Sequence, residues 1–301
     1  MRTLHASIDL ARLSADMSTN LLISLATTCS MLLIALTAEK FVPHARPPSS
    51  EHAWFNIRYT VVMLALLAGL RPLLLGIPLM FTRALGVGWI TFAPGILGWL
   101  CAFLAVLVMT DLLEYLFHRA QHQFSVLWRM HELHHSAQHY DVTLSYRHFW
   151  LEPMLKMTLL YPLIGVVFCV PVTVGIAVST IFLVNHHVEH MNVSFSPRRF
   201  ALLISHPQYH RLHHSRNERD YNKNFCDLLP LWDVLFRTLQ RPAHDEFVDV
   251  GLDSGVAPRS LMQALLWPWR RTQLGHASVT KTPVCETCLL NSEKISTREN
   301  A

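Results

Sequence analysis

Two short sequences in this chain each place three histidines at spacings of three and four residues, HELHHS at 131–136 and HRLHHS at 210–215. On a helix, residues three and four apart lie on one face about one turn apart, so imidazoles at these spacings can converge on a metal ion. Fourteen of the 19 histidines lie between residues 118 and 214. This concentration favours a metal site over a set of solvated helix faces.

Two histidine pairs add to these triads. HRAQH sets His118 and His122 four residues apart, and NHHVEH sets His186 and His190 at the same spacing, with His187 turned aside. We interpret each triad, joined by a pair or a lone histidine, as one half of a two-metal cage. Nine or ten well-spaced histidines without a cysteine among them are too many for one ion and unlike a structural zinc site. Imidazole suits iron, copper and zinc alike, so the spacing does not name the metal.

The composition indicates a membrane protein. Only 15% of the residues are charged, 51% are apolar and the mean hydropathy is +0.27, against roughly 25% charged residues in soluble domains. The net charge of +4 is modest and the basic residues are scattered, so we expect no nucleic acid partner. The six cysteines show no disulfide framework, and we interpret the CETC pair, Cys285 and Cys288, as part of a polar tail rather than a zinc site.

Three apolar runs precede the histidines. Residues 21–38 are uncharged and just long enough for a retained membrane helix. Residues 59–80 are interrupted by Arg71–Pro72, which indicates either one kinked helix or two shorter ones. Residues 84–110 carry no charge and are long enough to cross with tilt.

A fourth apolar run, 157–185, separates the two histidine-rich segments. As one straight helix it would place them on opposite sides of the membrane, which is incompatible with one shared site. Pro162 and Pro171 lie within the run. We expect the chain to fold at these prolines into a hairpin with arms of about fourteen residues, too short to cross and suited to one leaflet.

The histidine motifs and their surroundings resemble one known family. DLLEYLFHRAQHQFSVLWRMHELHHS, then HMNV, then HPQYHRLHHSRNERDYNKNFCDLLPLWDVLFRT are similar to the fatty acid hydroxylase and sterol desaturase superfamily, integral membrane di-iron oxygenases. The resemblance covers roughly 108–240 and includes motif order, spacing and flanking Trp, Ser, Asn and Asp residues. It implies metal ligands at His118, His122, His131, His134, His135, His190, His210, His213 and His214. His186 is a tenth candidate, ranked lower because several members carry another polar residue there.

Two carboxylates are candidates for orienting these ligands. Asp111 lies seven residues before His118, two turns up the same face, and could accept an N–H from a ligating imidazole; a helix-end aspartate at the membrane surface is the alternative. Where the family often has R-x-H-P-x-E, the sequence RHFWLE keeps Arg147 and Glu152 but moves the histidine to His148. Glu152 is therefore a second tentative site residue, and the role of His148 stays open.

Two further departures from the family pattern lie near the end of the resemblance. The usual FGT is FRT, with Arg237 in place of glycine, and the usual NYG is NFC at 224–226. Neither change affects a ligand. Both fall in the segment expected to close the site.

The resemblance implies an O2-dependent hydroxylase or desaturase of a lipid, with two iron ions (Fe2+/Fe3+) as cofactor and O2 as co-substrate. The lipid could be a sterol, a fatty acyl chain or a related molecule. We find no haem-, flavin- or iron–sulfur-binding segment, so we expect a separate electron donor protein of ferredoxin or cytochrome type. The alternatives are a membrane metal-binding or transport protein without oxygenase activity, and a non-catalytic scaffold. Histidines outside the spans argue against transport, and nine retained ligands argue against a scaffold.

We therefore expect an all-α integral membrane protein with about four transmembrane or membrane-embedded helical segments and a cytoplasmic, histidine-rich helical cap that holds a two-metal site. We expect the bacterial inner membrane, with the site on the cytoplasmic side by the positive-inside rule. The arginines behind that expectation are Arg119, Arg129, Arg147, Arg198, Arg199 and Arg211. The expected domains are an N-terminal polar segment 1–20, transmembrane helices 21–110, a di-iron domain 111–245 that includes the membrane hairpin 157–185, and a C-terminal segment 246–301, disordered from about 272.

Overall fold

The computed structural model describes residues 10–43, 50–86, 88–194, 202–243, 246 and 248–270. Arg198, Arg199, Cys285 and Cys288, and the tail from 272, lie outside the described residues. Contacts divide the chain into a compact unit, Met1–Pro268, and a second unit, Trp269–Ala301. The site and the helices described below belong to the first unit, apart from the last residue of η5 (Trp267–Trp269).

The described chain is mostly helical, which confirms the expected all-α fold class. Its helices are α1 Leu10–Phe41, α2 Ser50–Leu85, α3 Ile96–Gln123, α4 Ser125–His135, η1 Val142–Tyr146, α5 Leu151–Leu155, the π-helical η2 Lys156–Leu160, α6 Tyr161–Val167, α7 Val172–Glu189, α8 Pro207–His213, η4 Glu218–Asp220, α9 Leu231–Leu235, α10 Leu261–Leu265 and η5 Trp267–Trp269. Four stretches are long and apolar enough to cross a membrane: Leu21–Phe41, Ser50–Leu70, Ile96–Gln123 and Val172–Glu189. The sequence prediction of about four membrane segments is thus confirmed.

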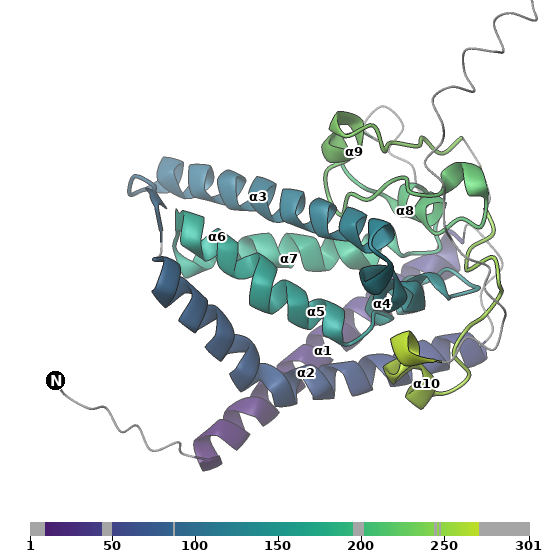
Figure 1. Cartoon of the computed structure of the whole chain (residues 1–301), viewed down its shortest axis with the longest axis horizontal. Helices are drawn as coiled ribbons and strands as arrows, with labels where there is room; N and C mark the ends of the chain where they lie inside the picture. Colours follow the sequence, from purple (N-terminus) through teal and green to yellow (C-terminus); the bar gives the residue numbers. More distant parts are fainter. Residues whose placement is uncertain are drawn as a thin grey trace, which may run out of the picture. The chain divides into compact units, whose positions relative to one another are not determined.

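Two apolar runs have different bounds from those expected. The run 84–110 is not one helix, because α2 ends at Leu85 and α3 begins only at Ile96. Pro94 and Gly95 precede α3, and Gly95 has a φ of 93°, which glycine adopts readily. The run 59–80 lies within the single helix α2, which bends along its length (Figure 1).

The apolar run 157–185 folds back on itself, as predicted, but only at its second proline. One arm consists of α5, η2 and α6 in direct succession, and α7 is the other arm. Pro162 stands at the start of α6, where the preceding turn is π-helical and the Tyr161 N–H bonds to the Lys156 carbonyl; a π turn re-routes the hydrogen bonds that a proline inside a helix disrupts. The expected arms of about fourteen residues were too short, since α7 alone has 18 residues.

The tip of this hairpin is held by a short parallel sheet. β1 (Ile90–Thr91) pairs with β2 (Phe168–Cys169), with Ile90 opposite Phe168. Gly88 is required here, because it has a φ of +67° and an added Cβ would lie 2.4 Å from the Cβ of Cys169. The link between α2 and α3 is thereby fixed to the hairpin.

The helices α3 and α7 begin near this sheet and run side by side in the same direction (Figure 1). Ala102 and Val106 of α3 pack against Val174 and Val178 of α7 in one buried cluster. The C-terminal ends of both helices therefore reach the same region of the molecule, where Figure 1 also places α4 and α8. Burying apolar surface between α3 and α7 thus positions the histidines that follow.

Arg237 has a backbone conformation that explains why glycine is usual at this position. It follows α9 with a φ of 60°, in the left-handed region, and its side chain is exposed. A residue with a side chain loses roughly 1–2 kcal/mol of stability in this region. Glycine avoids this loss, but part of the gain is offset because glycine makes the unfolded chain more flexible.

We expect Arg237→Gly to raise the free energy of unfolding by about 0.5–1 kcal/mol, measured by thermal unfolding in detergent. Arg237→Ala is the matched control, since it removes the charge but keeps the Cβ. An equal rise in the free energy of unfolding in both variants would show that the effect comes from the lost charge and not from the backbone conformation.

Candidate metal centre

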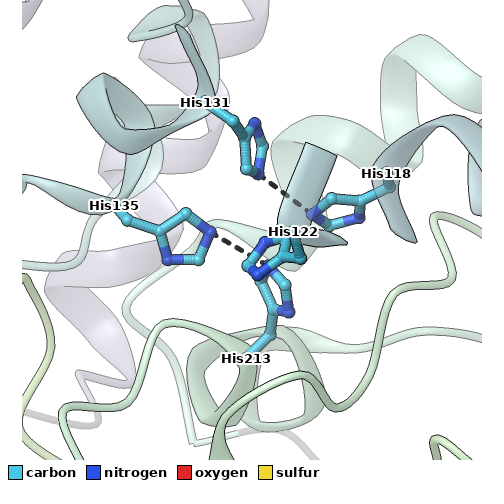
Figure 2. A group of neighbouring side chains, drawn as sticks. All are labelled: His118, His122, His131, His135 and His213. Atoms are coloured by element: carbon cyan, nitrogen blue, oxygen red, sulfur yellow. Dashed lines mark hydrogen bonds between the residues drawn. The ribbon is translucent and has the colours of Figure 1, made fainter. Parts of the chain in front are cut away.

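The nine histidines ranked as ligands come together in two groups. Within each group the coordinating nitrogen atoms all lie within 4.8 Å of one another. The five-histidine group is His118, His122, His131, His135 and His213, drawn in Figure 2, and the four-histidine group is His134, His190, His210 and His214. The structure therefore brings together every histidine of the nine and divides them between two positions.

The division differs from the one expected, because each triad contributes to both groups. In α4 the i,i+4 pair His131 and His135 belongs to the five-histidine group, while His134 belongs to the other. In α8 and its C-cap the assignment is reversed, with His213 alone in the five-histidine group. On a helix, position i+3 points about 60° away from position i and about 100° away from position i+4, so a triad can face two neighbouring centres.

Four helices end at this site. The ligand candidates lie in the last two turns of α3 and α4, in the last turn of α8, and at the C-caps of α7 and α8, His190 and His214. The C-terminal end of a helix carries unpaired carbonyl groups and partial negative charge, which favours a cation. The backbone therefore adds to the attraction of the site for metal ions.

The distances between rings suit metal coordination. The Nε2 atoms make contacts of 3.1 Å between His118 and His131 and between His135 and His213, and of 3.2 Å between His134 and His190, His190 and His210, and His210 and His214. With metal–nitrogen bonds of ~2.1 Å, adjacent ligand atoms of an octahedral or tetrahedral ion lie roughly 3.0–3.4 Å apart. The donor set therefore fits metal ions at both positions.

Hydrogen bonds at the other ring nitrogen orient several of these imidazoles. The Nδ1 atom of His118 lies 2.8 Å from the Phe225 carbonyl, that of His213 lies 2.8 Å from the Lys223 carbonyl, and that of His190 lies 2.7 Å from the His186 carbonyl. A carbonyl only accepts, so each Nδ1 carries the proton and each Nε2 offers its lone pair to the centre.

Burial keeps these rings neutral. His134, His135, His210, His213 and His214 are each at most 5% exposed. Burial lowers the pKa of His213 to about 3, and it lowers the pKa of His134 and His135 well below the usual value, with neighbouring histidines adding to the effect. Neutral imidazole is the form that binds metal.

Glu152 supports one ligand directly. Its Oε2 lies 2.5 Å from Gln121 Nε2 and 3.1 Å from His131 Nδ1, and its Oε1 accepts the Phe149 N–H at 3.1 Å. Burial alone would raise the pKa of Glu152, but His131 and His148 outweigh burial and hold that pKa well below its usual range. A carboxylate at this place fixes the orientation of His131 and makes it a stronger ligand.

Asp111 has a different role from the one expected. Its carboxylate accepts the backbone N–H groups of Leu228 and Leu229 and the indole N–H of Trp232, at 3.0, 3.1 and 2.8 Å. Among the described hydrogen bonds, none joins Asp111 to a ligating imidazole. Because its helix turn is buried against this loop, Asp111 anchors residues 228–232 to α3 instead.

The remaining nearby histidines lie outside the two groups. The Nε2 of His186, the lower-ranked tenth candidate, lies 2.6 Å from the Ser145 carbonyl, and its Nδ1 lies 3.3 Å from Glu189 Oε1. His186 therefore belongs to a smaller cluster with Glu189 and His190 rather than to the four-histidine group. His187 is turned aside, as predicted, with its Nδ1 2.7 Å from the Leu183 carbonyl. His148 stacks on His134, with ring centroids 4.1 Å apart, and its Nδ1 lies 3.4 Å from Glu152.

Asp233 is a functional residue that the motif contained but that was assigned no role. Its carboxylate accepts the N–H groups of Phe225 and Cys226, at 2.9 and 2.8 Å, and the hydroxyl groups of Tyr209 and Thr238, at 2.7 and 2.6 Å. The Phe225 carbonyl held in this way orients His118. The position of Asp233 in the sequence WDVLF, part of the resemblance to the family, could have pointed to it.

A cavity of about 580 Å³ reaches the site. At one end it is lined by histidines of both groups, among them His131 and His210. Elsewhere its walls are largely apolar and come from α2, α3, α6 and α7, with Gly175 and Phe182 on the last. The geometry can hold two metal ions beside a long apolar molecule.

The fold and the site define the class of protein, an all-α membrane protein with a buried histidine-rich centre where its helices end. The family model for fatty acid hydroxylase matches residues 103–238. These findings support the resemblance to the fatty acid hydroxylase superfamily that the motifs indicated.

Three similar proteins are enzymes of lipids by name. Ornithine lipid hydroxylase OlsE of Rhizobium tropici is 32% identical over 176 residues, 58% of this chain and 52% of that protein. Alkylglycerol monooxygenase of Homo sapiens is 30% identical over 154 residues, and that of Xenopus tropicalis 29% over 143 residues, covering 33% and 30% of those proteins. The chain thus matches about half or less of each relative. No solved structure matches this chain significantly.

We expect Glu152→Gln to weaken metal binding about 10- to 100-fold, because a neutral amide no longer stabilises the N–H of His131. Metal retention against a chelator series, measured by elemental analysis, tests this. Glu218→Gln, at an exposed carboxylate outside the site, is the control. Unchanged retention in Glu152→Gln would show that this carboxylate is not needed to orient its histidine.

Proposed function

We propose that this chain is an O2-dependent lipid hydroxylase that uses two iron ions held by the nine histidines. The observation that carries the proposal is the opening of both histidine groups onto one largely apolar cavity. The names of the relatives, a lipid hydroxylase and a monooxygenase, favour hydroxylation over desaturation. The lipid itself is the subject of the next section.

The bound irons would supply the oxidising chemistry, in which a C–H bond, O2, two electrons and two protons give an alcohol and water. The protein would orient the imidazoles through Glu152 and the backbone carbonyls, and the apolar walls would keep water away from the substrate C–H bond. Phe182 and Gly175 of α7 would lie along the lipid chain.

The partners and the location follow from this chemistry. Electrons would come from a separate donor protein of ferredoxin or cytochrome type. Residues 111–245 would form the catalytic domain and 21–110 the membrane helices. The protein would lie in the bacterial inner membrane with the site on the cytoplasmic side. Arg147 and Arg211 do not contribute to this assignment as surface charges, because both are buried: Arg147 donates to Ser136 and Arg211 to Asn192.

The metal assignment predicts about two irons per chain. His134→Ala and His135→Ala each remove one ligand from a different group, so each should lower the iron content and reduce lipid oxidation about 100-fold or more. Iron is measured by elemental analysis, and lipid oxidation by a mass shift of about +16 in extracts of cells that express the chain.

His139→Ala is the control, because His139 is exposed and lies outside both groups. A chain that holds labile zinc and leaves lipids unchanged would contradict the oxygenase and support a metal-binding or transport protein. A mass shift of about −2 would indicate desaturation.

The cavity walls predict a limit on the length of the substrate. Gly175 lines the cavity, and an added Cβ meets no atom within 4 Å. We expect Gly175→Leu to reduce oxidation of long-chain lipids about tenfold at unchanged iron content, because the side chain fills space that the lipid would occupy. Gly175→Ala is the matched control. Equal activity of both variants on all chain lengths would place the lipid elsewhere.

A further inference from the structure

The cavity beside the metal centre also contains four charged side chains. Glu114, Glu189 and Asp227 contribute carboxyl groups, and Lys156 contributes an ammonium group. Glu114 and Glu189 are 5% and 1% exposed. Three carboxyl groups against one ammonium group is an unusual content for a cavity whose other walls are largely apolar, because burying a charge without a partner is costly.

Among the described residues, a Lys or Arg lies beside only one of these carboxyl groups. Glu114 Oε2 lies 2.5 Å from Lys156 Nζ, and Tyr161 donates its hydroxyl hydrogen to the other oxygen. This ion pair joins α3 to the hairpin arm. The positive charge of Lys156 is therefore balanced by Glu114.

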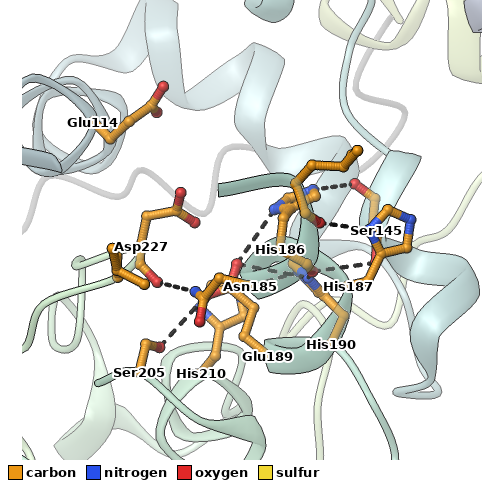
Figure 3. A network of polar contacts seen from close by, with 12 residues as sticks. Glu114, Ser145, Asn185, His186, His187, Glu189, His190, Ser205, His210 and Asp227 are labelled. Carbon is orange, nitrogen blue, oxygen red and sulfur yellow. Dashed lines mark hydrogen bonds and ion pairs between the residues drawn. The ribbon is translucent and has the colours of Figure 1, made fainter. Parts of the chain in front are cut away.

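Among the described residues, the hydrogen-bond partners of Glu189 carry no permanent positive charge, and the carboxyl group of Asp227 is one of them (Figure 3). Its Oε2 accepts long hydrogen bonds of 3.4 Å from Asn185 and from Ser205, and its Oε1 lies 3.3 Å from His186 Nδ1. Within the described ranges, no Lys or Arg nitrogen lies within 4 Å of the carboxyl oxygens of Glu189 or of Asp227.

Asp227 forms a hydrogen bond with the carboxyl group of Glu189 and lies in the field of the Glu114 carboxylate. Burial raises the pKa of Asp227 to about 6, and the charge of Glu114 adds to this effect, while Lys156 opposes it. The backbone carbonyl of Asp227, which accepts a hydrogen bond of 2.5 Å from Asn185, fixes its position. A buried carboxylate without a cation beside it is stabilised when a cation enters next to it.

We propose that Asp227 and Glu189, with Glu114 behind them, bind the positively charged amine of a lipid headgroup. This inference rests on the proposed function, since it assigns the substrate class to the same cavity. The headgroup would lie at the metal end, because Glu189 Oε1 is 3.8 Å from Nδ1 of the ligand candidate His190. The acyl or alkyl chain would extend along the apolar part toward Gly175.

The test compares two probes with the same chain, oleylamine and oleyl alcohol. The iron-loaded full chain in a neutral maltoside detergent is titrated with each probe by displacement of a fluorescent fatty alcohol. We expect the amine to bind at least about tenfold more tightly than the alcohol, which corresponds to ~1.4 kcal/mol. Asp227→Asn should abolish most of this preference without changing the affinity for the alcohol.

Glu218→Gln is the matched control and should keep the preference, because its carboxylate is exposed and Glu218 is not among the residues that line the cavity. Equal binding of both probes to the wild type would overturn the proposal. So would a shift of the iron absorption bands on adding oleylamine, since the amine would then ligate the metal. Glu189→Gln gives a second variant in case Asp227→Asn is unstable.

The two proposals can fail separately. Amine preference without any oxidised lipid would overturn the oxygenase and leave the headgroup site standing. Oxidised lipid without amine preference, in the wild type and in Asp227→Asn alike, would overturn the headgroup site and leave the oxygenase standing.

Discussion

The structure depends on the packing of nine imidazole rings in one place, seven of them buried and His118 and His122 partly buried. Packed together, these rings must stay neutral and point their lone pairs inward. This arrangement is favourable only when a cation binds to the lone pairs. Backbone carbonyls at Phe225, Lys223 and His186 fix three of the rings by accepting their Nδ1 protons. The ends of four helices add partial negative charge from the backbone. The remainder of the fold serves to bring these ends together.

The apolar helices meet this requirement by packing far from the metal centre. The sheet between β1 and β2 fixes the tip of the hairpin, and the cluster of Ala102, Val106, Val174 and Val178 aligns α3 with α7. Because both helices start at one end, their histidines arrive together at the other. Asp233 holds the loop that orients His118. Its carboxylate accepts four hydrogen bonds, two of them from the backbone of this loop at Phe225 and Cys226.

The sequence was sufficient to predict that nine or ten histidines gather in one place and that the run 157–185 folds back, because helical spacing and the need for one shared site are local or logical constraints. It did not show that Asp111 anchors 228–232, since a carboxylate seven residues before a histidine has many partners within reach once the chain folds. The turn of the hairpin was predicted to involve both prolines, but a π turn before Pro162 allows the helix to continue past it. Such accommodations depend on tertiary packing.

The division of the triads makes the two metal positions interdependent. His131 and His135 serve one position and His134 the other, while in the second triad His210 and His214 serve the latter and His213 the former. Any rotation of α4 or α8 that improved one position would disturb the other, so neither can be built alone. A transporter needs a site that releases its ion, and a reservoir needs no fixed partner site. Two interlocked positions beside one apolar cavity are instead suited to chemistry in which both ions act on the same bound molecule.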